Sequence, residues 1–126
     1  MIDIKDLPLD PLDHPARPAA GTPLCAVEEL ADPGARGFEF RVGERRFFAF
    51  VLRRGGAVSG FVNSCPHVGW PLTLDERFLT RDGGYIFCSV HGALFDFAGA
   101  GVTSPCLGQH LTVWPVAVRD GQVFTA

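Results

Sequence analysis

The sequence predicts an all-β protein with a single folded domain, built as an antiparallel β-sandwich or small barrel with a loop-rich subdomain inserted in it. Among 126 residues there are 15 glycines and 10 prolines, which interrupt long helices and favour turns. Apolar and polar residues alternate over short runs, which is the period of a half-buried strand. Hydrophobic residues make up 47% of the chain, enough for one domain with a core.

The N-terminal segment, residues 1–22, is predicted to be an extended, proline-rich tail, and residues 23–126 to form the domain. Prolines lack the backbone N–H and fix φ, so their repetition here disfavours helix and strand. His14 stands between Asp13 and Pro15, and we expect its side chain to be solvated.

The first part of the domain is predicted to form a three-stranded meander. A short strand at 25–27 and one helical turn at 28–30 precede it. Glycines separate the strands of the meander, so tight turns are expected at Gly43-Glu44 and Gly55-Gly56. The run 47–52 is apolar throughout and bounded by arginines, which is typical of a central strand. The meander strands are expected at 38–42, 47–52 and 58–62.

The rest of the domain is predicted to contain shorter strands around a subdomain that runs from about Asn63 to Leu107. Asp120-Gly121 is a strong hairpin signal between two apolar runs. The expected strands are 85–87, 94–97, 111–118 and 123–125.

Two Cys/His pairs are the features that carry chemistry. The first is Cys65-x-His67 and the second is Cys88-x-x-His91, with 20 residues between them. Each pair follows a predicted strand and is followed by a glycine, Gly69 or Gly92. Glycine lets backbone N–H groups approach a thiolate or sulfide closely and stabilise its charge. Two loops would then present one thiolate and one imidazole each to a shared point.

Two kinds of metal site accept these donors. A single tetrahedral zinc takes two cysteines and two histidines. A binuclear iron–sulfur cluster is the alternative, with two thiolates on one iron and two imidazoles on the other. Zinc sites of this composition usually place both cysteines on one element, whereas each loop here carries one ligand of each type. Two ordered pairs of this kind are hard to explain as unrelated core and surface residues.

The two boxes resemble those of Rieske [2Fe-2S] proteins. The matching segments are Cys65-Pro66-His67-x-Gly69 and Cys88-x-x-His91-Gly92. The downstream segments Leu94-Phe95-Asp96, Gly99-x-Gly101 and Trp114-Pro115-Val116 also resemble the soluble Rieske-type ferredoxins, so the similarity covers roughly residues 24–126.

The resemblance implies one [2Fe-2S] cluster held in a small subdomain of a β fold. It implies that Cys65 and Cys88 bind one iron and that His67 and His91 bind the other. Pro105 either matches the proline of a loop that covers the cluster in the family or is a plain turn former. Trp70 is either a docking residue beside the exposed histidines or a cover for the core.

The resemblance also bears on the reduction potential. Respiratory-type members carry two further cysteines joined by a disulfide, and Trp70 and Val90 stand in those positions here. High-potential members place a serine and a tyrosine hydroxyl near the cluster, where this chain has Ala93 and Phe95. Fewer hydrogen bonds to sulfur stabilise the reduced state less, so we expect a potential toward the negative end of the range.

As to function, the resemblance implies a soluble electron carrier that passes one electron from a flavoprotein reductase to an oxygenase or another acceptor. Alternatives are the Rieske-type small subunit of a larger reductase, such as a nitrite reductase, and a zinc-binding structural module. After the four ligands only His14 and His110 remain, so we expect no substrate chemistry by the chain alone.

Charge and hydropathy limit the partners and the compartment. The net charge of −3 offers no basic surface for nucleic acid. No apolar run approaches the roughly 20 residues that span a bilayer, so no membrane anchor is expected. Without an export signal at the N-terminus, the expected compartment is the cytoplasm.

Overall fold

The computed structural model describes residues 12–64, 72, 77–88, 92–104 and 106–126. Within these the fold is almost entirely antiparallel β-structure, as predicted, and the strands form three sheets without closing a barrel. The elements in chain order are β1 (Pro23–Ala26), the 3-10 turn η2 (Val27–Glu29), β2 (Gly34–Val42), β3 (Arg45–Arg54), β4 (Ala57–Val62), β5 (Ile86–Phe87), β6 (Leu94–Phe95), β7 (Val116–Arg119) and β8 (Gln122–Thr125).

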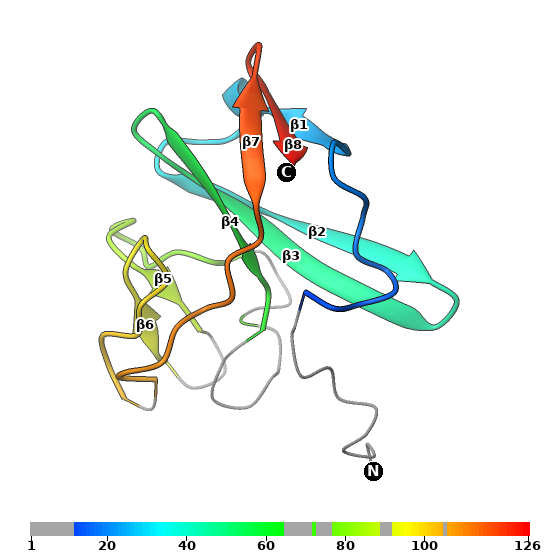
Figure 1. Ribbon diagram of the computed structural model, residues 1–126. Coiled ribbons are helices and arrows are strands. Elements are labelled where there is room, and N and C mark those ends of the chain that lie inside the picture. The colour runs from blue at the N-terminus through cyan, green and yellow to red at the C-terminus, as the bar shows by residue number, and fades with distance from the viewer. Residues whose placement is uncertain (1–11, 65–71, 73–76, 89–91, 105) are drawn as a thin grey trace.

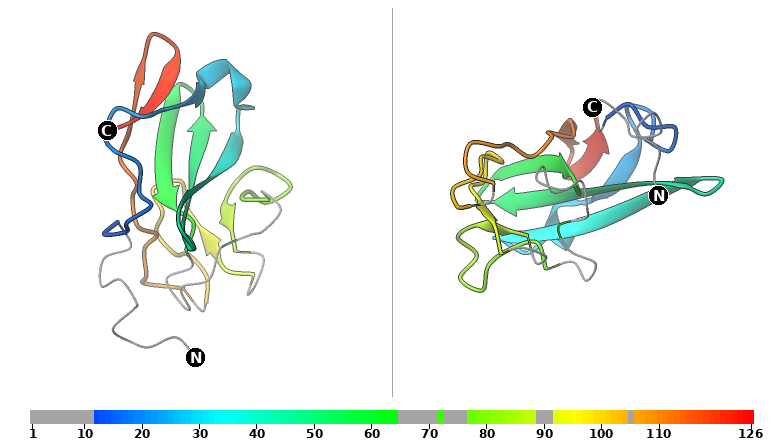
Figure 2. Two further views of the ribbon diagram at one scale, coloured as in Figure 1. Left: turned by 90° about the vertical axis from the view of Figure 1, so that its right-hand side faces the viewer. Right: turned by 90° about the horizontal axis from the view of Figure 1, so that it is seen from below.

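The meander β2–β3–β4 is the central sheet, and it confirms the predicted strands and turns. Val42 pairs with Arg45 across the first turn, and Arg54 pairs with Ala57 across the second. Gly43 and Gly55 have φ of 60° and 61°, a left-handed conformation that glycine adopts without strain. The meander lies between the β1–β8–β7 sheet and the β5–β6 hairpin (Figures 1 and 2).

Two buried clusters share this central sheet. Alternate side chains of β3 enter different clusters, which explains why the run 47–52 is apolar throughout. The hairpin core consists of Phe50, Leu52, Phe61, Leu72, Phe78, Ile86, Cys88, Ala93, Phe95, Cys106 and Leu111. The base core consists of Ala16, Cys25, Leu30, Phe47, Ala49, Val51, Val62, Trp114 and Val123.

The last predicted strand pair forms only in part. Asp120 and Gly121 have φ of 51° and 75°, which makes the tight β7–β8 turn that Asp-Gly predicts. The strand expected from residue 111 begins at Val116, because Pro115 cannot donate to a ladder. Before it, only an isolated bridge between Phe61 and Val113 joins this segment to β4.

The described part of the N-terminal segment, residues 12–22, has no helix or strand but packs on the base core through Ala16. Thr125 anchors it, because the Thr125 hydroxyl donates to Ala19 O at 2.7 Å and accepts from Thr22 N at 2.8 Å. His14 was expected in solvent, and that prediction was wrong. Its ring is partly buried against Phe47, 5.7 Å between centroids.

Candidate metal centre

Two of the predicted site residues, Cys88 and Gly92, fall in the described part of the chain. Cys65, His67, Gly69, Trp70, His91 and Pro105 lie outside the described residues. The described residues at the ends of these segments indicate where the site lies.

Cys88, the first residue of the second Cys/His box, directly follows β5 of the β5–β6 hairpin. Ile86 pairs with Phe95 and Phe87 with Leu94. The ladder continues by one more bond, from Cys88 N to Ala93 O at 2.9 Å. Cys88 is fully buried at the end of this ladder. The hairpin thus brings the first ligand candidate of the box into the core and leaves residues 89–92 to connect its two strands.

Gly92 closes that connection. Its N–H donates to Cys88 O at 2.8 Å, and its φ of 70° lies in the left-handed region. Any residue with a Cβ is strained there. The glycine after the second box is thus required by the backbone conformation, independently of any role toward a metal.

The segment with the first box has both of its ends held together. Asn63 directly follows β4, and its backbone N–H donates to Phe48 O at 2.9 Å. Its side-chain Oδ1 accepts a 2.7 Å hydrogen bond from Leu72 N, and Leu72 is fully buried. The two residues that flank the segment 64–71, which contains Cys65 and His67, are therefore hydrogen-bonded to each other.

A third segment, residues 101–109, is joined to the same hairpin. Leu94 N donates to Thr103 Oγ1 at 2.8 Å, and Val102 N donates to Leu94 O at 2.9 Å. Cys106 is fully buried in the hairpin core, as expected for a small hydrophobe. The predicted covering residue Pro105 thus belongs to a segment whose described neighbours contact the hairpin that carries the second box.

The ends of all three segments meet in the hairpin core. Leu72 ends the first loop, Cys88 and Ala93 flank the second, and Cys106 belongs to the third. Phe50 and Phe78 stack beneath them with ring centroids 4.4 Å apart. Loops that start from one buried core can present two thiolates and two imidazoles to one point, so the residues fit a Rieske cluster. No group of three possible metal ligands occurs among the described residues, where Cys88 is the one predicted ligand.

Asn63 and Thr103 are site residues that the sequence reasoning missed. Neither is a predicted metal ligand, and each acts through a hydrogen bond to the backbone of another segment. The signal for Asn63 was a polar side chain directly after an apolar strand and two residues before the first cysteine.

Three described groups have shifted pKa values. Hydrogen bonds from the Thr80 hydroxyl and from Gly84 N lower the pKa of the exposed Asp82 carboxyl, in the turn before β5, and the other two groups belong to the N-terminal half. Burial raises the pKa of the Cys25 thiol, and Cys25 belongs to the base core. Burial, together with the positive charge of Arg45, lowers the pKa of His14. The Nδ1 atom of His14 accepts a hydrogen bond from Ala16 N at 3.0 Å, which holds the ring in its neutral form. Both residues serve the packing of the N-terminal half.

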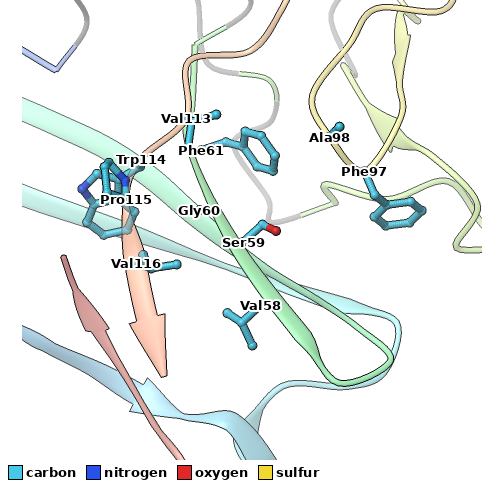
Figure 3. Close-up of a pocket in the computed structure, with 10 residues that line it drawn as sticks. All are labelled: Val58, Ser59, Gly60, Phe61, Phe97, Ala98, Val113, Trp114, Pro115 and Val116. Carbon is cyan, nitrogen blue, oxygen red and sulfur yellow. The ribbon is translucent and has the colours of Figure 1, made fainter. Parts of the chain in front are cut away.

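Two surface cavities are lined by described residues. One, of about 270 Å³, lies along β4 between the turn at 97–98 and the segment 113–116, and Figure 3 shows that its lining side chains are apolar except for Ser59. The other, of about 310 Å³, is lined by Arg77, Leu79, Thr80, Arg81 and Phe87. The lining of the second cavity includes Phe87, the residue before Cys88 of the second box. In the described residues no helix is long and apolar enough to cross a membrane.

Comparison with solved structures finds ferredoxins of dioxygenase systems. A chain in the complex of reduced oxygenase and oxidized ferredoxin of carbazole 1,9a-dioxygenase superposes with a TM-score of 0.65 at 30% identity, covering 82% of this chain and 99% of that one. A ferredoxin of Sphingomonas yanoikuyae B1 gives 0.60 at 27% identity, with 83% and 96% covered. The ferredoxin of carbazole 1,9a-dioxygenase from Nocardioides aromaticivorans IC177 shares the fold, at 0.63 and 21% identity, with 86% and 98% covered.

No curated protein matches the sequence. The model of the Rieske [2Fe-2S] domain matches residues 21–120, which include both boxes and all three segments of the hairpin core. The chain therefore belongs to the Rieske [2Fe-2S] domain family, and its cofactor is a Rieske [2Fe-2S] cluster.

Proposed function

We propose that this protein is a Rieske ferredoxin that carries one electron from a reductase to an oxygenase. The observation that carries the proposal is the match to a chain of the oxygenase–ferredoxin complex, at 30% identity and over 99% of that chain's length. The hairpin core supports it, because the ends of both ligand-bearing segments meet there. The cluster supplies reversible one-electron transfer when bound.

We further propose the ligand set. Cys65 and Cys88 would bind one iron, and His67 and His91 the other. Support comes from Cys88, which the β5–β6 ladder holds in the hairpin core, and from the hydrogen bond that joins Asn63 to Leu72. The remainder of the domain, from residue 23, would serve as a rigid base for the cluster-binding subdomain at about 63–107.

The protein's own residues would hold the cluster at one end of the fold and shield its cysteine side. Cys88, Ala93 and Phe95 are fully buried, which keeps water from the thiolate of Cys88. Leu107, which follows the buried Cys106 in the sequence, is 67% exposed. We propose that a redox partner docks at this end, with Trp70 and Pro105 in the contact. A cytoplasmic location is part of the proposal.

Cysteine variants test the ligand set with controls inside the same chain. Cys65→Ser and Cys88→Ser should abolish the reduced-state EPR signal of anaerobically purified protein and its iron and sulfide content. Cys25→Ser and Cys106→Ser should keep both, because neither residue belongs to a box. A cluster that survives Cys88→Ser would refute the assignment.

Two further measurements test the function. Wild-type protein should contain two irons and two sulfides and give an anisotropic signal with mean g below the free-electron value. Stoichiometric zinc without such a signal would refute the electron-carrier proposal. The reduced protein should then re-oxidise in the presence of an oxygenase and its substrate. A large subunit that co-purifies tightly would instead favour a subunit of a reductase.

A further inference from the structure

The side chain of Asn63 stands out in the hairpin half of the molecule because it is polar and buried. It is 8% exposed, and the other buried polar side chain in the described residues is Thr125, in the last strand. A buried polar group is costly unless it is hydrogen-bonded, so its partners indicate what it does.

Asn63 is joined to two different parts of the fold. Its backbone N–H donates to Phe48 O on β3 at 2.9 Å, which fixes its own position against the central sheet. Its side-chain Oδ1 accepts from Leu72 N at 2.7 Å. The side-chain amide of Asn63 therefore holds Leu72, the residue after the loop 64–71, close to the end of β4, from which the loop begins.

The side chain of Leu72 provides a second contact that fixes the end of this loop. Its side chain is fully buried in the hairpin core, which also contains Cys88 and Ala93 at the base of the second box. The hydrogen bond and the apolar packing act on the same residue. Together they set the position of the first loop's end relative to the hairpin that carries Cys88.

We propose that Asn63 is a positioning residue for the iron–sulfur site. It closes the loop that carries Cys65 and His67 and fixes that loop's span against the β5–β6 hairpin. The inference rests on the proposed ligand set. A loop whose two ends are already held together loses less conformational entropy when its ligands bind a cluster. Groups that orient metal ligands often change metal affinity tenfold or more.

The test compares two replacements of Asn63. Asn63→Leu keeps the shape of the side chain but removes the acceptor, so Leu72 N–H is left buried without it. Asn63→Asp keeps an oxygen in the acceptor position. The readouts are the rate of iron release to a chelator, the g values of the reduced cluster and the thermal midpoint. We expect Asn63→Leu to release iron about tenfold faster than wild type with shifted g values, and Asn63→Asp to restore the g values toward wild type.

Thr125→Val is the matched control. Thr125 is the other buried polar residue in the described part of the chain, and its hydroxyl also holds a distant segment, through Ala19 O and Thr22 N. This variant should lower the thermal midpoint but leave the g values and the rate of iron release as in wild type. The difference between the two variants separates positioning of the cluster from general loss of stability.

The outcomes are distinct. The inference is overturned if folded Asn63→Leu releases iron at the wild-type rate with unchanged g values, or if Thr125→Val releases it equally fast. Should Asn63→Leu not fold, Asn63→Ser gives the same comparison, because its hydroxyl is too short to reach Leu72 N. Wild-type protein without an iron–sulfur signal would refute the proposed function instead.

Discussion

A serine in place of Ala93 should raise the reduction potential, and the strand register explains why. Ile86 pairs with Phe95 and Phe87 with Leu94. Continuing this register by one step places Cys88 opposite Ala93, and the 2.9 Å bond from Cys88 N to Ala93 O joins the two residues. Side chains of such a pair lie on one face of the ladder with Cβ atoms about 4.5–5.5 Å apart. A hydroxyl on residue 93 would therefore reach the sulfur of Cys88.

The size of the effect depends on the hydrogen bond. A bond to a charged acceptor contributes about 1.5–3 kcal/mol, and the reduced cluster, with one more negative charge, gains more from it than the oxidised one. A difference of about 1–2 kcal/mol between the two states corresponds to about 40–90 mV for one electron. The wild-type protein, with Ala93 and a fully buried Phe95, should lie toward the lower end of the range from about −150 to +300 mV.

Spectroelectrochemical titration of wild type, Ala93→Ser and Ala49→Ser is the assay. Ala49 is also fully buried but belongs to the base core, so the same chemical change there should leave the potential unaltered. A potential of Ala93→Ser no higher than that of Ala49→Ser would refute the cross-strand placement. A wild-type value above about +200 mV would contradict the inference from the missing hydroxyls.

Three further predictions concern the glycines and the N-terminal segment. Gly92→Ala should lower the unfolding free energy by about 1–2 kcal/mol in chemical denaturation, because φ is 70°, while Gly56→Ala, with open space and no left-handed φ, should be nearly neutral. Gly60→Ala should destabilise more, since its Cβ would overlap Trp114 O, and denaturation midpoints as high as wild type would contradict that packing. Burial lowers the pKa of His14, so the unfolded state binds its proton more readily. Stability should be full above about pH 6.5 and fall on acidification, a slope that His14→Leu should reduce in titrations between about pH 5 and 8.

The sequence by itself determined the strands whose signals are local. The meander with its central strand over residues 47–52, its two glycine turns and the Asp120-Gly121 hairpin were all predicted and are present. The boxes with Cys88 and Gly92 could also be recognised, because ligand type, spacing and the following glycine are properties of adjacent residues. Both kinds of signal depend on backbone preferences and side-chain chemistry over a few positions.

Only the tertiary structure decided which segments meet. Thr125 holds residues 19–22 from the far end of the chain, and Ala16 packs in the base core, so the described part of the predicted tail, residues 12–22, lies against the domain. The hydrogen bond from Leu72 to Asn63 and the one from Leu94 to Thr103 join loops to the hairpin, and no pattern within one loop predicts them. The reason is physical: a buried polar group must find a partner wherever the fold brings one, and that partner's identity depends on the packing of all the elements at once.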